Sequence, residues 1–169
     1  AYLWENDDGS TPDTNTATGS ANSAVTSVKR GTRLNLRVQV SNSGTTALAN
    51  KVYKLQYHAT SVALVNLDCT QAVSTASSTW VDVGNGGPSN VPNVPTSVSP
   101  TSINFSLANS GDLADSITLS KLTAPTDEGG ALTYTNGYLN DNQAQTATGI
   151  TLTSHSYTEL VYPIHFGDS

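Results

Sequence analysis

Apolar and polar residues alternate strictly along residues 33–40. Leu34, Leu36, Val38 and Val40 share one face of an extended chain, and Arg33, Asn35, Arg37 and Gln39 share the other. A period of two predicts a half-buried β-strand with its apolar face on a core and its polar face in water. Burial of each apolar side chain contributes roughly 1.5–3 kcal/mol, so the register of this strand should be well fixed.

Residues 51–59 alternate in the same way, with Tyr53, Leu55 and Tyr57 on one face. Between the two stretches, residues 41–46 read Ser-Asn-Ser-Gly-Thr-Thr and are rich in turn formers. The chain is therefore predicted to reverse there, so that the two strands pair at the centre of the fold.

Further strand patterns are separated by turn signals. They cover residues 2–5, 22–28, 62–67, 78–83, 102–107, 116–122, 131–139, 148–153 and 156–166. The last stretch places Leu160, Tyr162, Ile164 and Phe166 on one face. About nine short strands with little or no helix predict an all-β, antiparallel sandwich. Residues 84–102 hold four of the seven prolines, which predicts a surface loop.

The composition supports one β-rich domain. Among 169 residues are 24 threonines and 21 serines, which favour strands and turns over long helices. We expect an N-terminal arm or first strand at residues 1–10 and a single sandwich domain at 11–169. No stretch is apolar enough for a membrane span, so no membrane insertion is expected. The chain begins at Ala1 and contains no methionine, which suggests a removed secretory leader and an extracellular or cell-surface location.

The charges are few and unevenly placed. The net charge is −6, yet six of the seven basic residues lie between positions 29 and 54. Without an aromatic stacking motif this stripe does not predict nucleic-acid binding. One interpretation is a solvated strand face. The other is that the acidic start docks on the basic stripe of its own or a neighbouring chain. The residues concerned are Glu5, Asp7, Asp8, Arg33, Arg37 and Lys54.

No cofactor is predicted. Asp7 and Asp8 lie in an acidic turn that could contribute to a calcium site, but the turn lacks a complete ligand set, and a hydrogen-bonded turn is the alternative. The single cysteine, Cys69, is interpreted as a partly buried small side chain. A lost partner or an interchain disulfide is the alternative.

Catalytic signatures are absent from the sequence, and no enzymatic role is predicted. His58 and His165 alternate outward on strands, and His155 lies in a turn, without the spacing of metal ligands. Glu159 and Asp82 could form a glycosidase pair only if the fold joined them, and a surface position is expected for them. Asn104 begins the single glycosylation sequon, Asn-Phe-Ser.

Several framework stretches resemble immunoglobulin-like modules of prokaryotic secreted and cell-surface proteins. They are residues 2–9, 32–44, 53–57, 80–84 and 149–162. The resemblance implies an immunoglobulin-like β-sandwich, with a jelly-roll-like variant as the alternative, and a surface location rather than a chemistry. Such modules usually continue past residues 159–162 into one more strand, often carrying a cysteine that would match Cys69. Because the sequence ends at Ser169, we expect that strand to be missing, with truncation of the chain as the alternative. The resemblance extends to pilin-like filament subunits of the donor-strand type.

These observations predict a structural subunit of an extracellular filament, such as a pilus, or of another surface assembly. A missing strand would leave the last strand with an open edge, with Leu160, Tyr162, Ile164 and Phe166 as acceptor. Tyr2, Leu3 and Trp4 would form the donor arm of an identical subunit, which gives an open homopolymer. The alternative for this arm is that it pairs within its own sheet. The alternative to a structural subunit is an adhesin or carbohydrate-binding module that binds glycans or other surface proteins.

Overall fold

The computed structural model describes residues 1–8, 11–29, 31–53, 55–57, 81–82, 84–85, 104–107, 116–140 and 149–167. These residues form fourteen strands and no helix, which confirms the all-β prediction. The three longest are β1 (Tyr2–Asn6), β2 (Thr32–Asn42) and β14 (Ser156–Gly167). The others are β3 (Leu48–Lys51), β4 (Gln56–Tyr57), β5 (Val81–Asp82), β6 (Gly84–Asn85), β7 (Asn104–Leu107), β8 (Ser116–Ile117), β9 (Thr126–Asp127), β10 (Gly130–Ala131), β11 (Thr133–Tyr134), β12 (Gly137–Leu139) and β13 (Ile150–Leu152).

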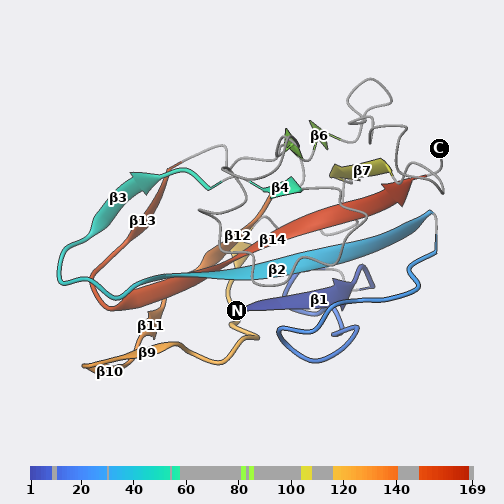
Figure 1. Cartoon of the computed structure of the whole chain (residues 1–169). Helices are drawn as coiled ribbons and strands as arrows, with labels where there is room; N and C mark the ends of the chain where they lie inside the picture. Colours follow the sequence, from blue (N-terminus) through green and yellow to red (C-terminus); the bar gives the residue numbers. More distant parts are fainter. Residues whose placement is uncertain are drawn as a thin grey trace, which may run out of the picture.

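Strands β2 and β14 form the centre of the main sheet (Figure 1). They pair antiparallel over their whole shared length, from Asn42 opposite Ser156 to Thr32 opposite Phe166. On the other edge of β2 lies β1, also antiparallel, with Tyr2 opposite Val38. The predicted hairpin between residues 32 and 59 is wrong. Strand β3 instead pairs with β13, and β4 pairs with β5.

The second edge of β14 is also paired. Strands β11 and β12 lie parallel to its first half, and β7 lies antiparallel to its last residues. Pro163 falls between the β12 and β7 segments, where the missing N–H of proline costs no ladder bond. The sheet is therefore mixed rather than purely antiparallel, and the expected open edge along Leu160–Phe166 is not found.

A close backbone approach positions β12. A Cβ atom built on Gly137 would lie 1.9 Å from the carbonyl oxygen of Glu159, so only glycine allows β12 to come so near β14. Strand β8 then extends the sheet beyond β12.

The apolar core covers one face of β2 and β14. Its buried members are Ile150, Leu152, Leu160, Tyr162 and Ile164, and Trp4, Leu36, Val40, Tyr53, Leu55 and Phe166 pack against them. The predicted shared face of Leu160, Tyr162, Ile164 and Phe166 is thus confirmed. Because β13 supplies two core residues from outside the main sheet, the packing has the two layers expected of a sandwich. An immunoglobulin-like strand order stays a prediction.

Other strand predictions are corrected or lie outside the described residues. Residues 22–28 contain no strand, and the predicted strand at 131–139 is divided into three short ones. The patterns at 62–67 and most of 78–83, the loop at 84–102 beyond β6, and Cys69, Trp80 and His58 lie outside the described residues.

Candidate functional site

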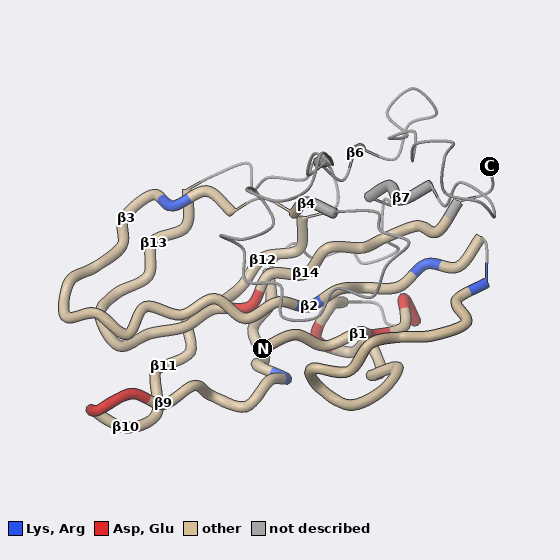
Figure 2. The backbone as a smooth tube through the Cα atoms, in the orientation of Figure 1, with Lys and Arg blue, Asp and Glu red and all other residues tan. Residues whose placement is uncertain are grey.

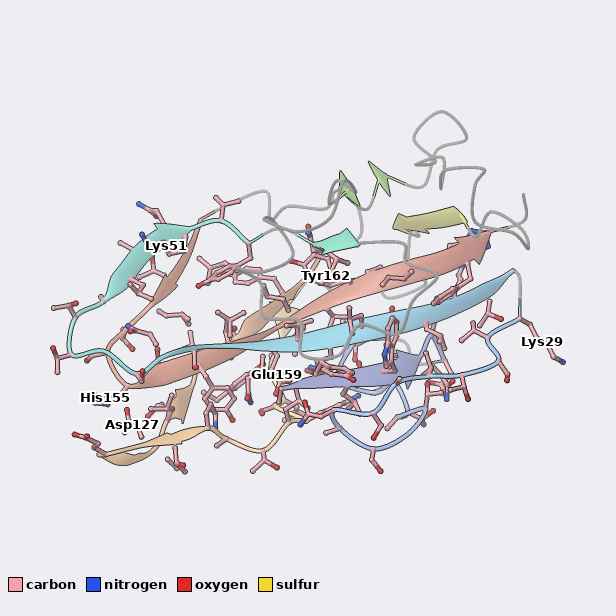
Figure 3. All side chains as sticks on the ribbon, in the orientation of Figure 1. Lys29, Lys51, Asp127, His155, Glu159 and Tyr162 are labelled. Carbon is pink, nitrogen blue, oxygen red and sulfur yellow. The ribbon has the colours of Figure 1, made fainter. Side chains whose placement is uncertain are left out.

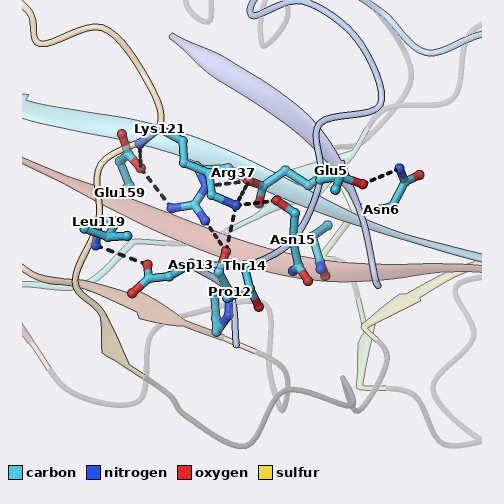
Figure 4. A network of polar contacts seen from close by, with 12 residues as sticks. Glu5, Asn6, Pro12, Asp13, Thr14, Asn15, Arg37, Leu119, Lys121 and Glu159 are labelled. Carbon is cyan, nitrogen blue, oxygen red and sulfur yellow. Dashed lines mark hydrogen bonds and ion pairs between the residues drawn. The ribbon is translucent and has the colours of Figure 1, made fainter. Parts of the chain in front are cut away.

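Arg37 lies at the centre of a buried charge cluster on the second face of the sheet (Figure 4). The sequence predicts this face of β2 to be in water, but Arg37 and Asn35 are both 0% exposed. The guanidinium reaches three separate segments. Its Nε lies 3.1 Å from Glu5 Oε1, its Nη1 donates to Glu159 Oε2 at 2.9 Å, and its Nη2 donates to the Pro12 carbonyl at 2.7 Å.

Lys121 supplies the second cation. Its Nζ lies 2.9 Å from Glu5 Oε1 and donates to the carbonyls of Pro12 and Asn15 at 3.1 and 2.5 Å. The cluster therefore contains two cations and two carboxylates, so its formal charges balance. That balance matters because an uncompensated charge in a dry interior is very costly.

The two carboxylates are held in different ways. Glu159 accepts four hydrogen bonds, from Arg37 Nη1, Ser120 Oγ and the backbone N–H groups of Lys121 and Leu122. Glu5 is also 0% exposed, but its Oε2 has no hydrogen-bond partner, and its Oε1 makes ion contacts without hydrogen-bond alignment. Glu5 is thus retained mainly by charge attraction.

Two loops cover the cluster. Asp13 accepts hydrogen bonds from the Thr118 N–H and hydroxyl, at 3.0 and 2.6 Å, and from the Leu119 N–H at 3.1 Å. Burial alone would raise the pKa of Asp13, but these hydrogen bonds outweigh it and lower the pKa. Tyr134 lies nearby, and its burial, together with the negative charge of Glu159, raises its pKa to about 12.

The outer edge of β1 is paired with residues 16–22 of its own chain. The Asn6 N–H donates to the Thr16 carbonyl at 2.8 Å, the Thr18 N–H to the Trp4 carbonyl at 2.9 Å, and the Asn22 N–H to the Tyr2 carbonyl at 2.8 Å. Strand β1 is therefore bonded on both sides. In this structure Tyr2, Leu3 and Trp4 are part of their own sheet and not a free donor arm.

The predicted docking of acids on the basic stripe is found in part, and within the chain. Glu5 meets Arg37 as predicted. Asp7 accepts a 3.4 Å hydrogen bond from Asn35, and Asp8 accepts from the Thr16 N–H and hydroxyl, which lower its pKa. The turn is thus hydrogen-bonded, and the described residues contain no group of three potential metal-binding side chains. Arg33 is exposed, and Lys54 lies outside the described residues.

Neither the predicted acceptor residues nor Glu159 takes the position expected. Leu160, Tyr162 and Ile164 are buried in the core, 5% exposed or less, so they offer no open groove. Glu159 was expected at the surface, but it lies inside the fold, whereas Lys29 and Lys51 project from it (Figure 3). Its possible partner Asp82 and the sequon residue Asn104 lie on described strands, but their side chains lie outside the description.

An open groove lies on the apolar side of β1. It has a volume of about 580 Å³ and is lined by Ala1, Tyr2, Trp4, Asn22, Ala24, Val25, Leu36, Val38 and Gln39. Tyr2 and Trp4 alternate with Leu3 and Glu5 along β1, so one strand contributes to the groove on one side and to the charge cluster on the other.

A separate ion pair lies at the β9–β10 turn, where acidic residues mark one end of the molecule (Figure 2). His155, in the turn predicted for it and with a φ of 50°, places Nδ1 2.6 Å from Asp127 Oδ2. His155 is 48% exposed, in contrast to the buried cluster.

Lys121 of the cluster, and Asp13 and Pro12 of the loop that covers it, were not predicted as site residues. Two signals in the sequence were available. Lys121 is the only Lys or Arg outside positions 29–54, and Glu159 is the only acid in the strand pattern at 156–166. Comparison with protein-family models, curated proteins and solved structures gave no match. In the described part of the chain, no helix suits a membrane crossing.

Proposed function

We propose that this chain is a structural module of an extracellular or cell-surface assembly, whose copies join through strand β1. The observation that carries the proposal is the attachment of β1. Its buried residues Leu3 and Glu5 fit a slot made by β2, the distant loop at 118–122 and the loop at 11–15 that follows β1 in the chain.

A strand held in this way can serve in its own sheet or in that of a neighbour. Residues 7–31 separate β1 from its sheet neighbour β2, so no tight hairpin turn joins these two strands. Exchange of β1 between copies would re-form the same contacts in the slot of a neighbour. The local concentration of β1 near each slot would decide whether the exchanged or the unexchanged form prevails. Head-to-tail exchange between unlike surfaces yields a filament when the rotation between copies does not close a ring. The Ser/Thr-rich composition and the resemblance to surface modules support the location.

A disulfide trap tests the exchange. Both Tyr2 backbone groups bond to Asn22 rather than to β2, so Tyr2 and Val38 form a non-hydrogen-bonded pair, the closer type of cross-strand pair. A Tyr2→Cys/Val38→Cys variant in a Cys69→Ser background should oxidise within the chain in dilute monomer. In assembled material it should form a ladder of covalent oligomers on non-reducing gels.

Intramolecular disulfides alone in assembled material would show that β1 does not join the copies. Deletion of residues 1–8 provides a second test. The deleted protein should polymerise poorly and recover when a peptide of that sequence is added. Normal fibres from the deleted protein would contradict the proposal.

A carbohydrate-binding module is the second candidate, because Tyr2 and Trp4 line one open groove beside Asn22. Aromatic faces and an amide are groups that can contact a sugar ring. Trp4→Ala should then abolish retention on a polysaccharide that binds the unmodified chain. Tyr138→Ala is the control, since Tyr138 is 43% exposed and is not among the residues that line the groove. Equal retention of both variants would exclude this groove as the binding site.

A further inference from the structure

We infer that the slot beside β2 recognises its strand by a single buried carboxylate, and that the partner it fits is the N-terminal strand of a second copy of this chain. This inference rests on the proposed function and adds to it the chemistry of recognition. The carboxylate is that of Glu5, which lies between Arg37 and Lys121.

The charge balance of the slot requires an acid. Without β1, Arg37 Nε and Lys121 Nζ would both lose their carboxylate contact, which is Glu5 Oε1. Glu159 already accepts four hydrogen bonds, and Asp13 is bonded to the loop at 118–119, so neither replaces Glu5 between the two cations. An incoming strand that brings no negative charge would bury the two cations without that contact, which is strongly unfavourable.

The carboxylate also selects the register. Leu3 lies opposite Arg37 and Glu5 lies opposite Asn35, so the Glu5–Arg37 contact is a diagonal cross-strand pair. A shift by one residue would turn Trp4 or Asn6 toward the two cations and leave Glu5 on the apolar side. The slot therefore fits an extended strand with an apolar residue followed two positions later by a glutamate.

A pair of charge-exchanged full-length chains tests this recognition. Glu5→Lys gives a site with three cations and one carboxylate, and Arg37→Glu gives one cation and three carboxylates. Each chain alone should lose stability and remain unassembled. In a one-to-one mixture each strand fits the slot of the other chain with balanced charges. We therefore expect a heteromeric complex by native mass spectrometry, at least tenfold favoured over either self-association.

Two further chains complete the test. The double variant Glu5→Lys/Arg37→Glu restores the balance within one chain and should regain most of the lost stability. Lys51→Glu, which changes an exposed residue of β3, should behave as the unmodified chain. If the double variant folds normally but the co-refolded mixture yields no heteromer, recognition of a second copy's strand by this carboxylate is wrong.

The outcomes separate the two proposals. An unmodified chain that assembles while the mixed variants do not pair overturns the recognition alone. An unmodified chain that never assembles, together with variants that do pair, supports the recognition and overturns the proposed assembly function.

Discussion

Both faces of the β2–β14 pair contain buried residues, but these residues are held by different forces. On one face, Leu160, Tyr162 and Ile164 pack with aliphatic and aromatic neighbours. On the other, Arg37 and Glu159 are each 0% exposed and belong to a balanced set of charges. Alternation along a strand therefore identifies which residues share a face, but it does not establish that the polar face is in water.

The difference has consequences for specificity. Apolar burial is non-directional and tolerates changes of shape at moderate cost. A buried ion cluster gains little net stability over an apolar core of equal volume, but the loss of one member leaves its partners unpaired. The charged face should therefore be the less tolerant of single changes, and this is the face that holds β1.

The largest effect is expected on the charged face. Arg37→Ala would leave two buried carboxylates with a single cation, Lys121, and should lower the free energy of unfolding by about 3–5 kcal/mol. Chemical denaturation measures the change. Arg33→Ala, an exposed arginine of the same strand, is the matched control and should cost no more than about 1 kcal/mol. Equal effects for the two variants would show that the cluster contributes nothing specific.

A somewhat smaller effect is expected on the apolar face. Leu160 is 1% exposed within the core cluster, so Leu160→Ala should cost about 3 kcal/mol through lost burial and a residual cavity. Val52→Ala, at a residue 50% exposed, should change the free energy of unfolding by less than about 0.5 kcal/mol. A cost for Leu160→Ala above that of Arg37→Ala would reverse the proposed ranking of the two faces.

The sequence predicts the faces of the long strands well because each carries a sustained pattern. The positions at 34–40 and 160–166 alternate over enough residues to identify a side. The Arg37 face is shielded from solvent by the loops at 11–15 and 118–122. The sequences of these loops show no period of two or 3.6 residues, so they do not predict that they cover a strand. Their hydrogen bonds to Arg37, Lys121 and Glu159 exist only in the folded chain.

Strand pairing was the least predictable part. The turn formers at 41–46 suggested a local hairpin, but β2 pairs with β14, more than a hundred residues away. Alternation contains no information on which strand lies alongside. Two-residue strands such as β8 and β11 are too short for any pattern to identify them.

A titration at high pH gives a third comparison. Burial raises the pKa of Tyr162 to about 12, so the folded state favours the neutral phenol. The resulting stability is complete below the unfolded pKa of about 10 and is lost as pH rises toward 12, by on the order of 2 kcal/mol. Tyr162→Phe should make the stability profile less steep in this window, measured by denaturation at each pH, and the contribution of Tyr134, whose pKa is also raised to about 12, should remain. The exposed Tyr138→Phe should leave the profile unchanged, and identical profiles for all three chains would contradict the assignment.

The smallest effect is expected at the exposed ion pair of Asp127 and His155, which contrasts with the buried pairs of Arg37. The side-chain hydrogen bond from His155, followed by that from the Gly129 N–H, lowers the pKa of Asp127 below 3.8. Stability from this carboxylate is therefore present above pH 3.8 and is lost as the pH falls through the lowered value. In His155→Ala the carboxyl pKa, followed by NMR, should rise toward 3.8, with almost no change in stability at neutral pH because exposed pairs contribute little. A carboxyl pKa unchanged by the substitution would show that His155 does not hold Asp127 in solution.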